Sequence, residues 1–333
     1  MNVLITGGAG FLGARLAREL LAAGPLAVAG QPERPLRRLT LVDRAPVPAD
    51  LAADGRVTAI EGDLAALLAP GGAARDALAA TDLVFHLAAA VSGECEADFD
   101  LGMEANLATT QALLAVCRAL DGHPVVVFAS SLAVFGHAAE HPLPPVVDDH
   151  TLPAPQSSYG TQKLIGEHLL ADYTRKGFLA GRAVRLMTVS VRPGRPNAAA
   201  SGFLSGIIRE PLAGQRAVCP VPAQTEAALA SPARAIEGLL CAATASAAAW
   251  GGHTAVTLPA LTVSVAGMVA ALARVAGPEA AARIDWVRDP AIERLVLSWP
   301  ARVRADRARG LGLAPDPDFE SVIRMHIAES QDR

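Results

Sequence analysis

Short apolar runs alternate along this chain with longer stretches in which apolar residues recur every three or four positions. The apolar runs have the length of strands and lie at residues 1–6, 39–42, 56–60, 83–85, 125–128 and 183–188. Helical periodicity is present at residues 14–23, 97–120, 157–170 and 261–276. Strands that alternate with helices are typical of a parallel sheet with right-handed crossovers, so the pattern predicts an α/β fold.

The alternation loosens after the sixth apolar run. We therefore expect a doubly wound parallel sheet with a smaller C-terminal substrate lobe. Residues 1–190 are predicted to form the nucleotide-binding core with the catalytic groups. Residues 191–333 are predicted to form mainly the substrate lobe, with part of 230–260 returning to the core.

Composition narrows the classes of function. A chain of 333 residues with 51% apolar content can bury a large core, and a net charge of -4 without a basic stripe argues against a nucleic-acid partner. There is no run of 18 or more apolar residues, and the first residues already belong to a strand, so we expect neither a membrane span nor a signal peptide, and a cytoplasmic location. The four cysteines are scattered, which argues against a disulfide framework or a metal site.

A glycine-rich turn joins the first strand to the first helix. It reads Gly7-Gly-Ala-Gly10-Phe-Leu-Gly13, with the strand before it and the helical pattern after it. Glycines in this context allow a tight turn and a close approach of the backbone to a pyrophosphate, while the helix N-terminus supplies free amide groups. The stretch predicts a dinucleotide site, and a turn without a ligand is the less common alternative.

The second strand ends in Asp43. An acidic residue at this point accepts hydrogen bonds from the ribose hydroxyls and repels a 2′-phosphate, which favours NAD over NADP. Arg44 follows at once and can receive such a phosphate, so the strictness of the preference stays open. The separation of Gly13 from Asp43 exceeds the usual spacing of about 20 residues because a proline-containing loop at 24–38 intervenes.

Further polar and small residues follow the third and fourth strands. Asp63 can cap a helix or lie at the adenine. Ala88 and Ala89 leave room for a flat nucleotide beside the backbone, whereas His86 is interpreted as structural. Asn106, in the helical stretch at 97–120, has a polar side chain among apolar neighbours and can tie backbone segments together.

Tyr159 and Lys163 stand four positions apart at the start of a predicted helix, so their side chains lie on the same face. A positive charge beside a phenol lowers its pKa from about 10 toward neutrality, and the pair can then act as a general base. On spacing alone, two solvated surface side chains are the more common case. Ser131, at the end of the fifth strand, lies where an open α/β sheet places its chemistry, although serine also serves in plain turns.

In combination these motifs resemble the extended short-chain dehydrogenases/reductases of the NAD-dependent epimerase/dehydratase family, over essentially the whole chain. The resemblance implies a Rossmann fold, NAD as cofactor, a role as an oxidoreductase and a homodimer formed through the helices that begin near residues 97 and 159. It also implies that Ser131, Tyr159 and Lys163 are catalytic. The residues expected to contact the cofactor are Gly7, Gly10, Phe11, Leu12, Gly13, Asp43, Asp63, Leu64, Ala88, Ala89, Asn106, Tyr159, Lys163 and Thr188.

Four stretches resemble the members of this family that oxidise small sugar acids. They lie at residues 89–94, 157–163, 191–200 and 208–212. The implied reaction is NAD-dependent oxidation of a secondary hydroxyl in a hydroxy acid or sugar acid, with Tyr159 as general base. Because a guanidinium binds a carboxylate through two parallel hydrogen bonds, Arg192 is predicted to contact the substrate, together with Ser92, Ser131 or Asn197. A surface arginine in a turn is an equally good interpretation of Arg192.

Two alternatives stay open. A nucleotide-sugar 4-epimerase or dehydratase has the same core and catalytic groups, but such enzymes usually carry an arginine and an aromatic residue where this chain has the stretch at 224–232. Met187, where a proline is common, is a smaller departure. A regulator that binds the cofactor without turnover is the second alternative, and the intact serine, tyrosine and lysine argue against it. Trp286 and Trp299 are interpreted as packing residues.

Overall fold

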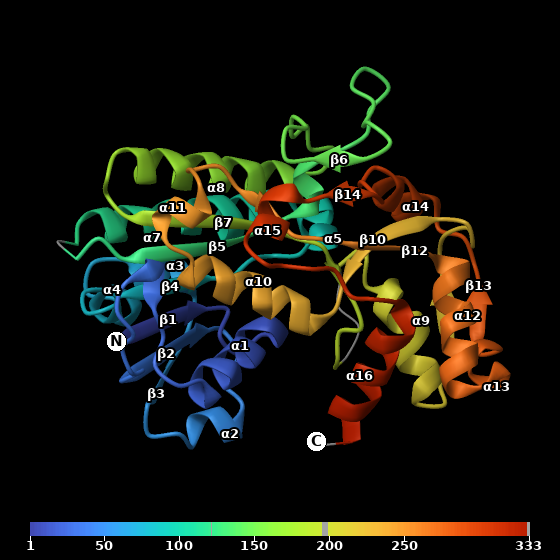
Figure 1. Ribbon diagram of the computed structural model, residues 1–333, viewed down its shortest axis with the longest axis horizontal. Coiled ribbons are helices and arrows are strands. Elements are labelled where there is room, and N and C mark those ends of the chain that lie inside the picture. The colour runs from blue at the N-terminus through green and yellow to red at the C-terminus, as the bar shows by residue number, and fades with distance from the viewer. Residues whose placement is uncertain (121, 195–198, 332–333) are drawn as a thin grey trace.

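The computed structural model describes residues 1–120, 122–194 and 199–331. Within them, seven parallel strands form a central sheet in the order β11-β7-β5-β4-β1-β2-β3 (Figure 1). In chain order these strands are β1 (Asn2–Thr6), β2 (Arg38–Asp43), β3 (Val57–Glu61), β4 (Leu83–His86), β5 (Val125–Ser131), β7 (Ala180–Leu186) and β11 (Val256–Thr257). The prediction of an α/β fold with a doubly wound parallel sheet is confirmed.

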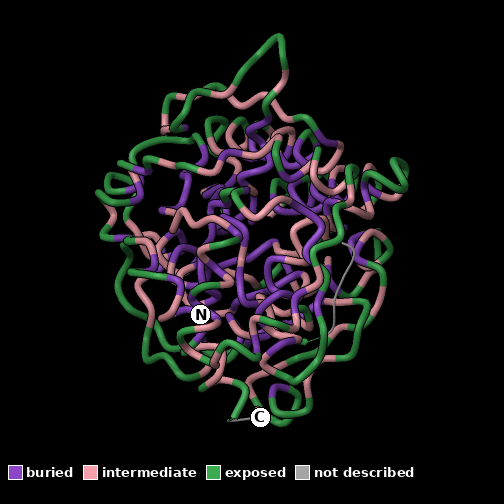
Figure 2. The backbone as a smooth tube through the Cα atoms, turned by 90° about the vertical axis from the view of Figure 1, so that its right-hand side faces the viewer, coloured by how far each residue is buried: buried purple, intermediate pink, exposed green. Residues whose placement is uncertain are grey.

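Helices cover both faces of this sheet. On one face, α1 (Phe11–Ala22) and α10 (Pro232–Thr244) bury their apolar sides against the strands. The other face is covered by helices that pack against the same strands from the opposite side: α3 (Leu64–Leu68), α4 (Ala73–Leu78), α7 (Thr109–Arg118) and α8 (Ser158–Arg175). Figure 2 shows the buried backbone in the interior, with exposed segments around it. The central strands β1, β4 and β5 are mainly apolar because both of their faces are covered, whereas the edge strand β3 is largely exposed.

A smaller group of elements lies beside the sheet, at the right of Figure 1. Its own apolar cluster joins α9 (Phe203–Leu212), α12 (Val265–Ala276) and α16 (Phe319–Gln331). Two small sheets accompany them: β8 (Thr188–Val189), β10 (Glu226–Ala230) and β12 (Leu261–Ser264) in one, β9 (Ala217–Cys219) and β13 (Ile284–Trp286) in the other. Helix α10 and strand β11 pack on the central sheet, and the division of the chain at residue 190 stays a prediction.

The remaining elements are short. They are η1 (Val28–Gly30), α2 (Ala49–Ala52), α5 (Ser92–Ala97), α6 (Phe99–Gly102), the π-helical η2 (Met103–Ala108), η3 (Leu132–Val134), β6 (Val147–Asp148), α11 (Ala247–Trp250), α13 (Pro278–Ala281), α14 (Pro290–Leu297), β14 (Val303–Arg304) and α15 (Asp306–Gly310). Strand β14 pairs with β6 and so ties the end of the chain to the loop before α8. None of the helices in the described ranges combines the length and the apolar character that a bilayer crossing needs.

Two predicted helices differ in the structure. The stretch at 97–120 contains the last residue of α5, then α6, η2 and α7, and it changes from α-helical to π-helical geometry at Met103. The stretch at 261–276 is helical only from Val265, because Leu261–Ser264 forms a strand that pairs antiparallel with β10. The β-branched residues Thr262 and Val263 favour a strand here. The Ser264 hydroxyl then caps α12 by accepting a hydrogen bond from the amide of Gly267 at 3.0 Å.

Candidate active site

A cleft of about 500 Å³ opens at the carboxyl ends of the central strands. The chain runs outward from β1 to β2 and β3, then crosses back to β4 and continues outward to β5 and β7. The carboxyl ends of β1 and β4 therefore flank the point at which the winding reverses, where open α/β sheets bind their ligands. The predicted site residues that line the cleft are Gly7, Gly10, Phe11, Leu12, Gly13, Asp43, Asp63, Leu64, Ala88, Ala89, Ser92, Ser131, Tyr159, Lys163, Thr188 and Arg192.

Two of the predicted residues stand apart from this lining. Asn106 is buried beside the cleft, where it accepts a hydrogen bond from the amide of Ala90 at 2.7 Å and donates one to Gln162 at 2.8 Å. It therefore holds the backbone that follows β4, and a direct contact with a cofactor stays a prediction. Asn197 lies outside the described residues.

The glycine-rich turn forms one end of the cleft. Gly7 has a positive φ of 72°, and a Cβ atom on it would lie 2.8 Å from the amide nitrogen of Ala88. A Cβ atom on Gly13 would lie 2.0 Å from the carbonyl oxygen of Gly7. Side chains at these positions are therefore excluded. The N-cap residue of α1 is Gly10, which has no side chain to cap the helix, so the first amide groups of α1 are available to a phosphate.

Asp43 lies beside this turn, at the tip of β2. Its Oδ2 accepts hydrogen bonds from the amides of Ala9 at 3.0 Å and Gly10 at 3.2 Å, and its Oδ1 accepts one from Ala45 at 3.0 Å. Arg44 lines the same part of the cleft. A carboxylate fixed by three amides at this point presents acceptors to ribose hydroxyls, and it is consistent with the cradle that a dinucleotide requires.

Asp63 combines the two interpretations that its sequence position allows. Its carboxylate accepts a hydrogen bond from the amide of Ala66 at 3.2 Å and so caps α3. The same residue lines the cleft beside Leu64. The helix cap thus fixes the position of a polar group in the wall of the cleft.

His86 is a structural residue under the cleft. Its two ring nitrogens make hydrogen bonds with Thr6 at 2.7 Å and Thr110 at 2.9 Å. Burial, with a smaller effect of the positive charge of Lys163, lowers the pKa of His86 to about 3. The imidazole therefore stays neutral and joins β4 to β1 and α7.

Helix α8 brings Tyr159 and Lys163 to the centre of the cleft. Ser157 begins the helix by accepting a hydrogen bond from the amide of Gly160 at 3.1 Å. A Cβ atom on Gly160 would lie 2.1 Å from the carbonyl oxygen of Ala133, so the glycine lets α8 pack directly against the segment that follows β5. This close approach sets Tyr159 beside Ser131, with which it shares a hydrogen bond.

Lys163 is buried beneath the tyrosine. Its Nζ donates a hydrogen bond to the carbonyl oxygen of Ala129 at 2.9 Å and lies 5.7 Å from the centre of the Tyr159 ring. Burial lowers the pKa of Lys163 to about 8. The amine therefore changes its charge close to neutral pH.

The prediction that the charge of Lys163 lowers the pKa of Tyr159 toward neutrality is wrong. Burial raises the pKa of Tyr159 to about 12, and the groups that oppose this rise are Ser131, by its hydrogen bond, and Arg192, by its charge. The cause is desolvation, which disfavours the charged phenolate more than the neighbouring charges favour it.

Arg192 lies at the opposite end of the cleft from the glycine-rich turn. Its guanidinium donates a hydrogen bond to the Ser201 hydroxyl at 3.1 Å, and no carboxylate of the described residues forms an ion pair with it. Burial and the nearby charge of Arg209 lower the pKa of Arg192. A half-buried cation without an acidic partner among the described residues favours an anionic ligand.

Ser92 lies beside the same segment. It is buried, and its Oγ accepts a hydrogen bond from the amide of Ala200 at 3.2 Å. This bond links the start of α5 to the segment that carries Ser201. Ser92 therefore helps to shape the Arg192 end of the cleft.

Some residues that line the cleft were not predicted to belong to the site: Ser130, Met187, Ser201 and Trp299. Trp299, interpreted as a packing residue, does pack against Leu132 and Met187, and it also forms part of the cleft wall. Ser130 could have been predicted from the sequence, because it directly precedes Ser131 at the end of the same strand. Trp299 carried no such signal, since it reaches the cleft from a distant part of the chain.

Known proteins resemble this chain over nearly its full length. A model of the NAD dependent epimerase/dehydratase family matches residues 3–227. The D-erythronate dehydrogenase of Cupriavidus necator is 51% identical over 334 residues, with 99% of each protein covered. That of Haemophilus influenzae is 39% identical over 327 residues, which cover 98% of this chain and 99% of the relative. A crystal structure from Agrobacterium tumefaciens, described as a nucleoside-diphosphate-sugar epimerase, is 41% identical with a TM-score of 0.88 and covers 100% of this chain and 95% of that one.

Proposed function

The chain belongs to the NAD-dependent epimerase/dehydratase family, and we propose that it is a dehydrogenase that oxidises a secondary hydroxyl of a small sugar acid such as D-erythronate. One observation carries this proposal. The same cleft contains Tyr159, which is hydrogen-bonded to Ser131, and Arg192, which has no acidic partner among the described residues. The names of the two relatives, each similar over its full length, support the choice of a four-carbon acid.

The nucleotide end of the cleft fits NAD. The glycine cradle, in which Cβ atoms on Gly7 or Gly13 would collide with the backbone, leaves space for a pyrophosphate, and Asp43 offers its carboxylate to the ribose. The negative charge of Asp43 favours NAD over NADP, with Arg44 as the residue that can soften this preference. When bound there, NAD would supply the acceptor for the hydride of the substrate carbon, since this redox chemistry belongs to the cofactor.

The proton of the substrate hydroxyl is taken by Tyr159. Its phenolate is the general base, and the Ser131 hydroxyl holds the substrate oxygen that loses the proton. Lys163 contributes a positive charge beneath the phenol, which stabilises the phenolate while it exists. Burial raises the pKa of Tyr159 to about 12 against the opposing effects of Ser131 and Arg192, so positive charge near the phenol governs how readily this base forms.

Arg192 binds the carboxylate of the substrate. A guanidinium can donate two parallel hydrogen bonds to a carboxylate, and Arg192 faces the cleft without an acid to neutralise it among the described residues. Ser92 lines the same cleft and is proposed to contact the substrate as well, since it bonds the segment that carries Ser201. A substrate with a carboxylate close to a secondary alcohol satisfies both ends of this pocket.

The test is a cofactor-reduction assay with the purified protein. NADH formation is followed with D-erythronate, with other C4 sugar acids, with β-hydroxy acids and with threonine. We expect NADH to accumulate with D-erythronate, and more slowly when NADP replaces NAD. Absence of NADH with every acid would contradict the proposal.

A nucleotide-sugar epimerase is the second candidate, since the Agrobacterium tumefaciens structure carries that description. An epimerase returns its hydride to the product, so it interconverts UDP-sugars without net formation of NADH. Analysis of UDP-sugars by NMR after incubation with the protein separates the two reactions. The arginine and the aromatic residue that usually hold the second nucleotide are missing from the stretch at 224–232, which favours the dehydrogenase.

The proposal includes the arrangement of the chain. Residues 191–333 supply mainly the substrate end of the cleft, through Arg192, Ser201 and Trp299. Two copies are proposed to associate through the helices that begin near residues 97 and 159. In the structure these are α6, η2 and α7 on the one hand and α8 on the other, and they pack against one another.

A further inference from the structure

A stripe of three polar residues runs along the face of α8 that meets the central sheet. Tyr159, Lys163 and Glu167 follow one another at intervals of four positions, so each lies one turn beyond the last. The first two line the cleft. Glu167 lies behind them and is buried, with 5% of its surface exposed. The proposed reaction gives Glu167 no role, although a buried carboxylate is costly unless it is paired.

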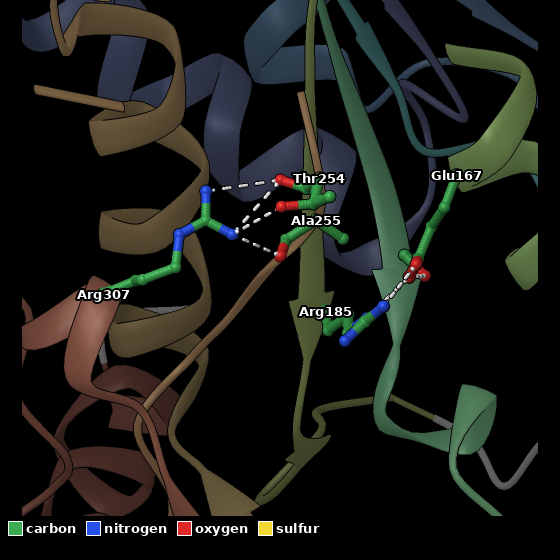
Figure 3. A network of polar contacts seen from close by, with 6 residues as sticks. Glu167, Arg185, Thr254, Ala255 and Arg307 are labelled. Atoms are coloured by element: carbon green, nitrogen blue, oxygen red, sulfur yellow. Dashed lines mark hydrogen bonds and ion pairs between the residues drawn. The ribbon is translucent and has the colours of Figure 1, made fainter. Parts of the chain in front are cut away.

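The carboxylate of Glu167 is fully engaged by two neighbouring strands. Arg185 on β7 donates hydrogen bonds from Nε and Nη2 to its two oxygens, at 2.9 and 2.7 Å (Figure 3). The Ser130 hydroxyl on β5 donates a third to Oε1 at 2.5 Å. Ser130 and Arg185 are register partners on these adjacent strands. The Arg185 guanidinium also lies 4.9 Å from the centre of the Phe135 ring.

This cluster connects directly to the catalytic groups. Ser130 stands between Ala129, whose carbonyl accepts the hydrogen bond of Lys163, and Ser131, which bonds Tyr159. A bond from Ser130 to Glu167 therefore fixes the end of β5 against α8 at the point where all three catalytic groups meet. Displacement of Glu167 would shift the acceptor of Lys163 and the hydroxyl of Ser131 together.

We propose that Glu167 and Arg185 are positioning residues: they hold the end of β5 against α8, and the Glu167 carboxylate keeps the Lys163 amine protonated in the working range of the enzyme. The inference rests on the function proposed above, because it assigns these residues to the support of Lys163. It adds a second, buried layer of charge behind the catalytic groups.

The charges around Lys163 show why Glu167 matters. The titratable and charged groups that face it come from β4, α5, α8 and β7, and they are His86, Cys95, Tyr159, Glu167 and Arg185. His86 is neutral, and burial raises the pKa of the Cys95 thiol, so that it too stays neutral. Cys95 and Glu167 are the groups that oppose the burial that lowers the pKa of Lys163 to about 8. Because the thiol keeps its proton, Glu167 is the one of the two that carries a standing negative charge.

Two substitutions should move the titration of Lys163 in opposite directions. Glu167→Gln removes the negative charge and leaves Arg185 uncompensated, so the pKa of Lys163 falls further. Arg185→Gln removes the positive charge and leaves Glu167 unpaired, so the pKa of Lys163 rises. We expect the alkaline limb of kcat/KM to move by about one pH unit, downward in the first variant and upward in the second.

Arg182→Met is the matched control. Arg182 is a buried cation on the same strand, and its bonds go to the carbonyl oxygens of Ala242 and Ala245, on the face away from α8. Its loss should lower Tm without moving the alkaline limb. If both glutamine variants also show a lower Tm with an unchanged alkaline limb of kcat/KM, the cluster has only a structural role and the inference is overturned. If Glu167→Gln fails to fold, the inference is tested by Arg185→Gln alone, in which the alkaline limb of kcat/KM should move upward.

NADH affinity provides a readout that does not depend on the substrate. Because Lys163 lines the cofactor cleft, the pH at which NADH binding weakens should shift with the alkaline limb in each variant. A wild-type protein that binds NADH but oxidises no acid would refute the proposed function, while the shifts in NADH binding would still test the role of Glu167. Turnover of D-erythronate with identical binding profiles in all variants would refute only the positioning role.

Discussion

At the scale of single residues, the chemistry of the cleft depends on a phenol and an amine that burial pushes in opposite directions. Burial raises the pKa of Tyr159 to about 12 and lowers that of Lys163 to about 8, since each environment disfavours the charged form. In the protein alone, the tyrosine therefore keeps its proton at neutral pH. Formation of the base relies on every positive charge and hydrogen bond that faces the phenol, which is why Ser131 and Arg192 matter as well as Lys163.

Tyr159→Phe should lower turnover by roughly 10² to 10⁴, because the substrate hydroxyl loses its general base. NADH binding should persist, since the cradle of glycines is untouched. Steady-state kinetics and a fluorescence titration with NADH measure the two effects. Tyr173→Phe is the control: Tyr173 is the other tyrosine of the chain and lies on the same helix, packed against Phe178. Near-normal turnover in Tyr159→Phe would remove this residue from the mechanism.

Arg192→Ala should raise KM for the acid by about 10- to 100-fold, which corresponds to a lost charge-assisted hydrogen bond of about 1.5–3 kcal/mol. The affinity for NADH should not change, because Arg192 lies at the other end of the cleft. Arg288→Ala is the control, an exposed arginine paired with Glu293. Equal KM values in Arg192→Ala and the wild type would assign Arg192 to the surface turn that its sequence position also allows.

At the scale of elements, glycines decide how closely α8 and the end of β5 approach. Gly160→Ala should lower the free energy of unfolding by about 1–3 kcal/mol, because the new methyl group meets the carbonyl oxygen of Ala133. Turnover should fall too, since Tyr159 is the preceding residue. Gly55→Ala, where a Cβ atom meets open space, should change stability by less than about 0.5 kcal/mol. Chemical denaturation and kinetics of both variants provide the comparison, and equal behaviour would show that α8 has room to move.

His86 makes the junction of β4, β1 and α7 sensitive to acid. Its pKa is about 3 in the folded protein and about 6.5 when unfolded, so the unfolded chain binds more protons between these values. Neutral His86 therefore makes its full contribution to the free energy of unfolding above about pH 6.5. This contribution is lost as the pH falls, by up to about 3 kcal/mol at about pH 4.

The substitution His86→Gln should flatten this dependence, because the group that titrates is gone. Denaturation midpoints measured at several pH values test the effect, and the carboxylates contribute equally to all variants. The exposed His150 offers a control, since His150→Gln should leave the slope unchanged. A slope in His86→Gln as steep as that of the wild type would place the acid sensitivity elsewhere.

Elements were predictable where local pattern and tertiary packing agree. Each of the first six strands of the central sheet contains a short apolar run, and helical stretches lie between most of them, so the α/β class follows from sequence alone. The helix predicted at 261–276 begins too early, because the apolar spacing of a helix continues through Leu261–Ser264. Pairing with β10 makes these four residues a strand instead. The stretch at 97–120 hides the π-helical segment η2, since hydrophobic spacing does not report a change of helical geometry.

At the scale of the whole molecule, the site was predictable where it is built from short motifs. The glycine-rich turn and the Tyr159–Lys163 pair reach the cleft because each is attached to the carboxyl end of a strand or to a helix that packs there. Trp299 and Ser201 could not be predicted, because the folding of the smaller lobe brings them to the cleft. The buried pair of Glu167 and Arg185 is likewise a product of register between β5, β7 and α8, which spacing along the chain does not reveal.

The proposed homodimer is the prediction that belongs to the molecule as a whole. Phe99 is 60% exposed on α6, beside α5 and α8, where its ring would be covered by a second copy. Phe99→Glu should therefore shift the protein from dimer to monomer, because association would bury a charge without a partner. Sedimentation equilibrium at several concentrations measures the change, and Trp286→Glu is the control because Trp286, 47% exposed, lies in the smaller lobe. A dimer unaffected by Phe99→Glu, or dissociated by Trp286→Glu instead, would place the interface on another face.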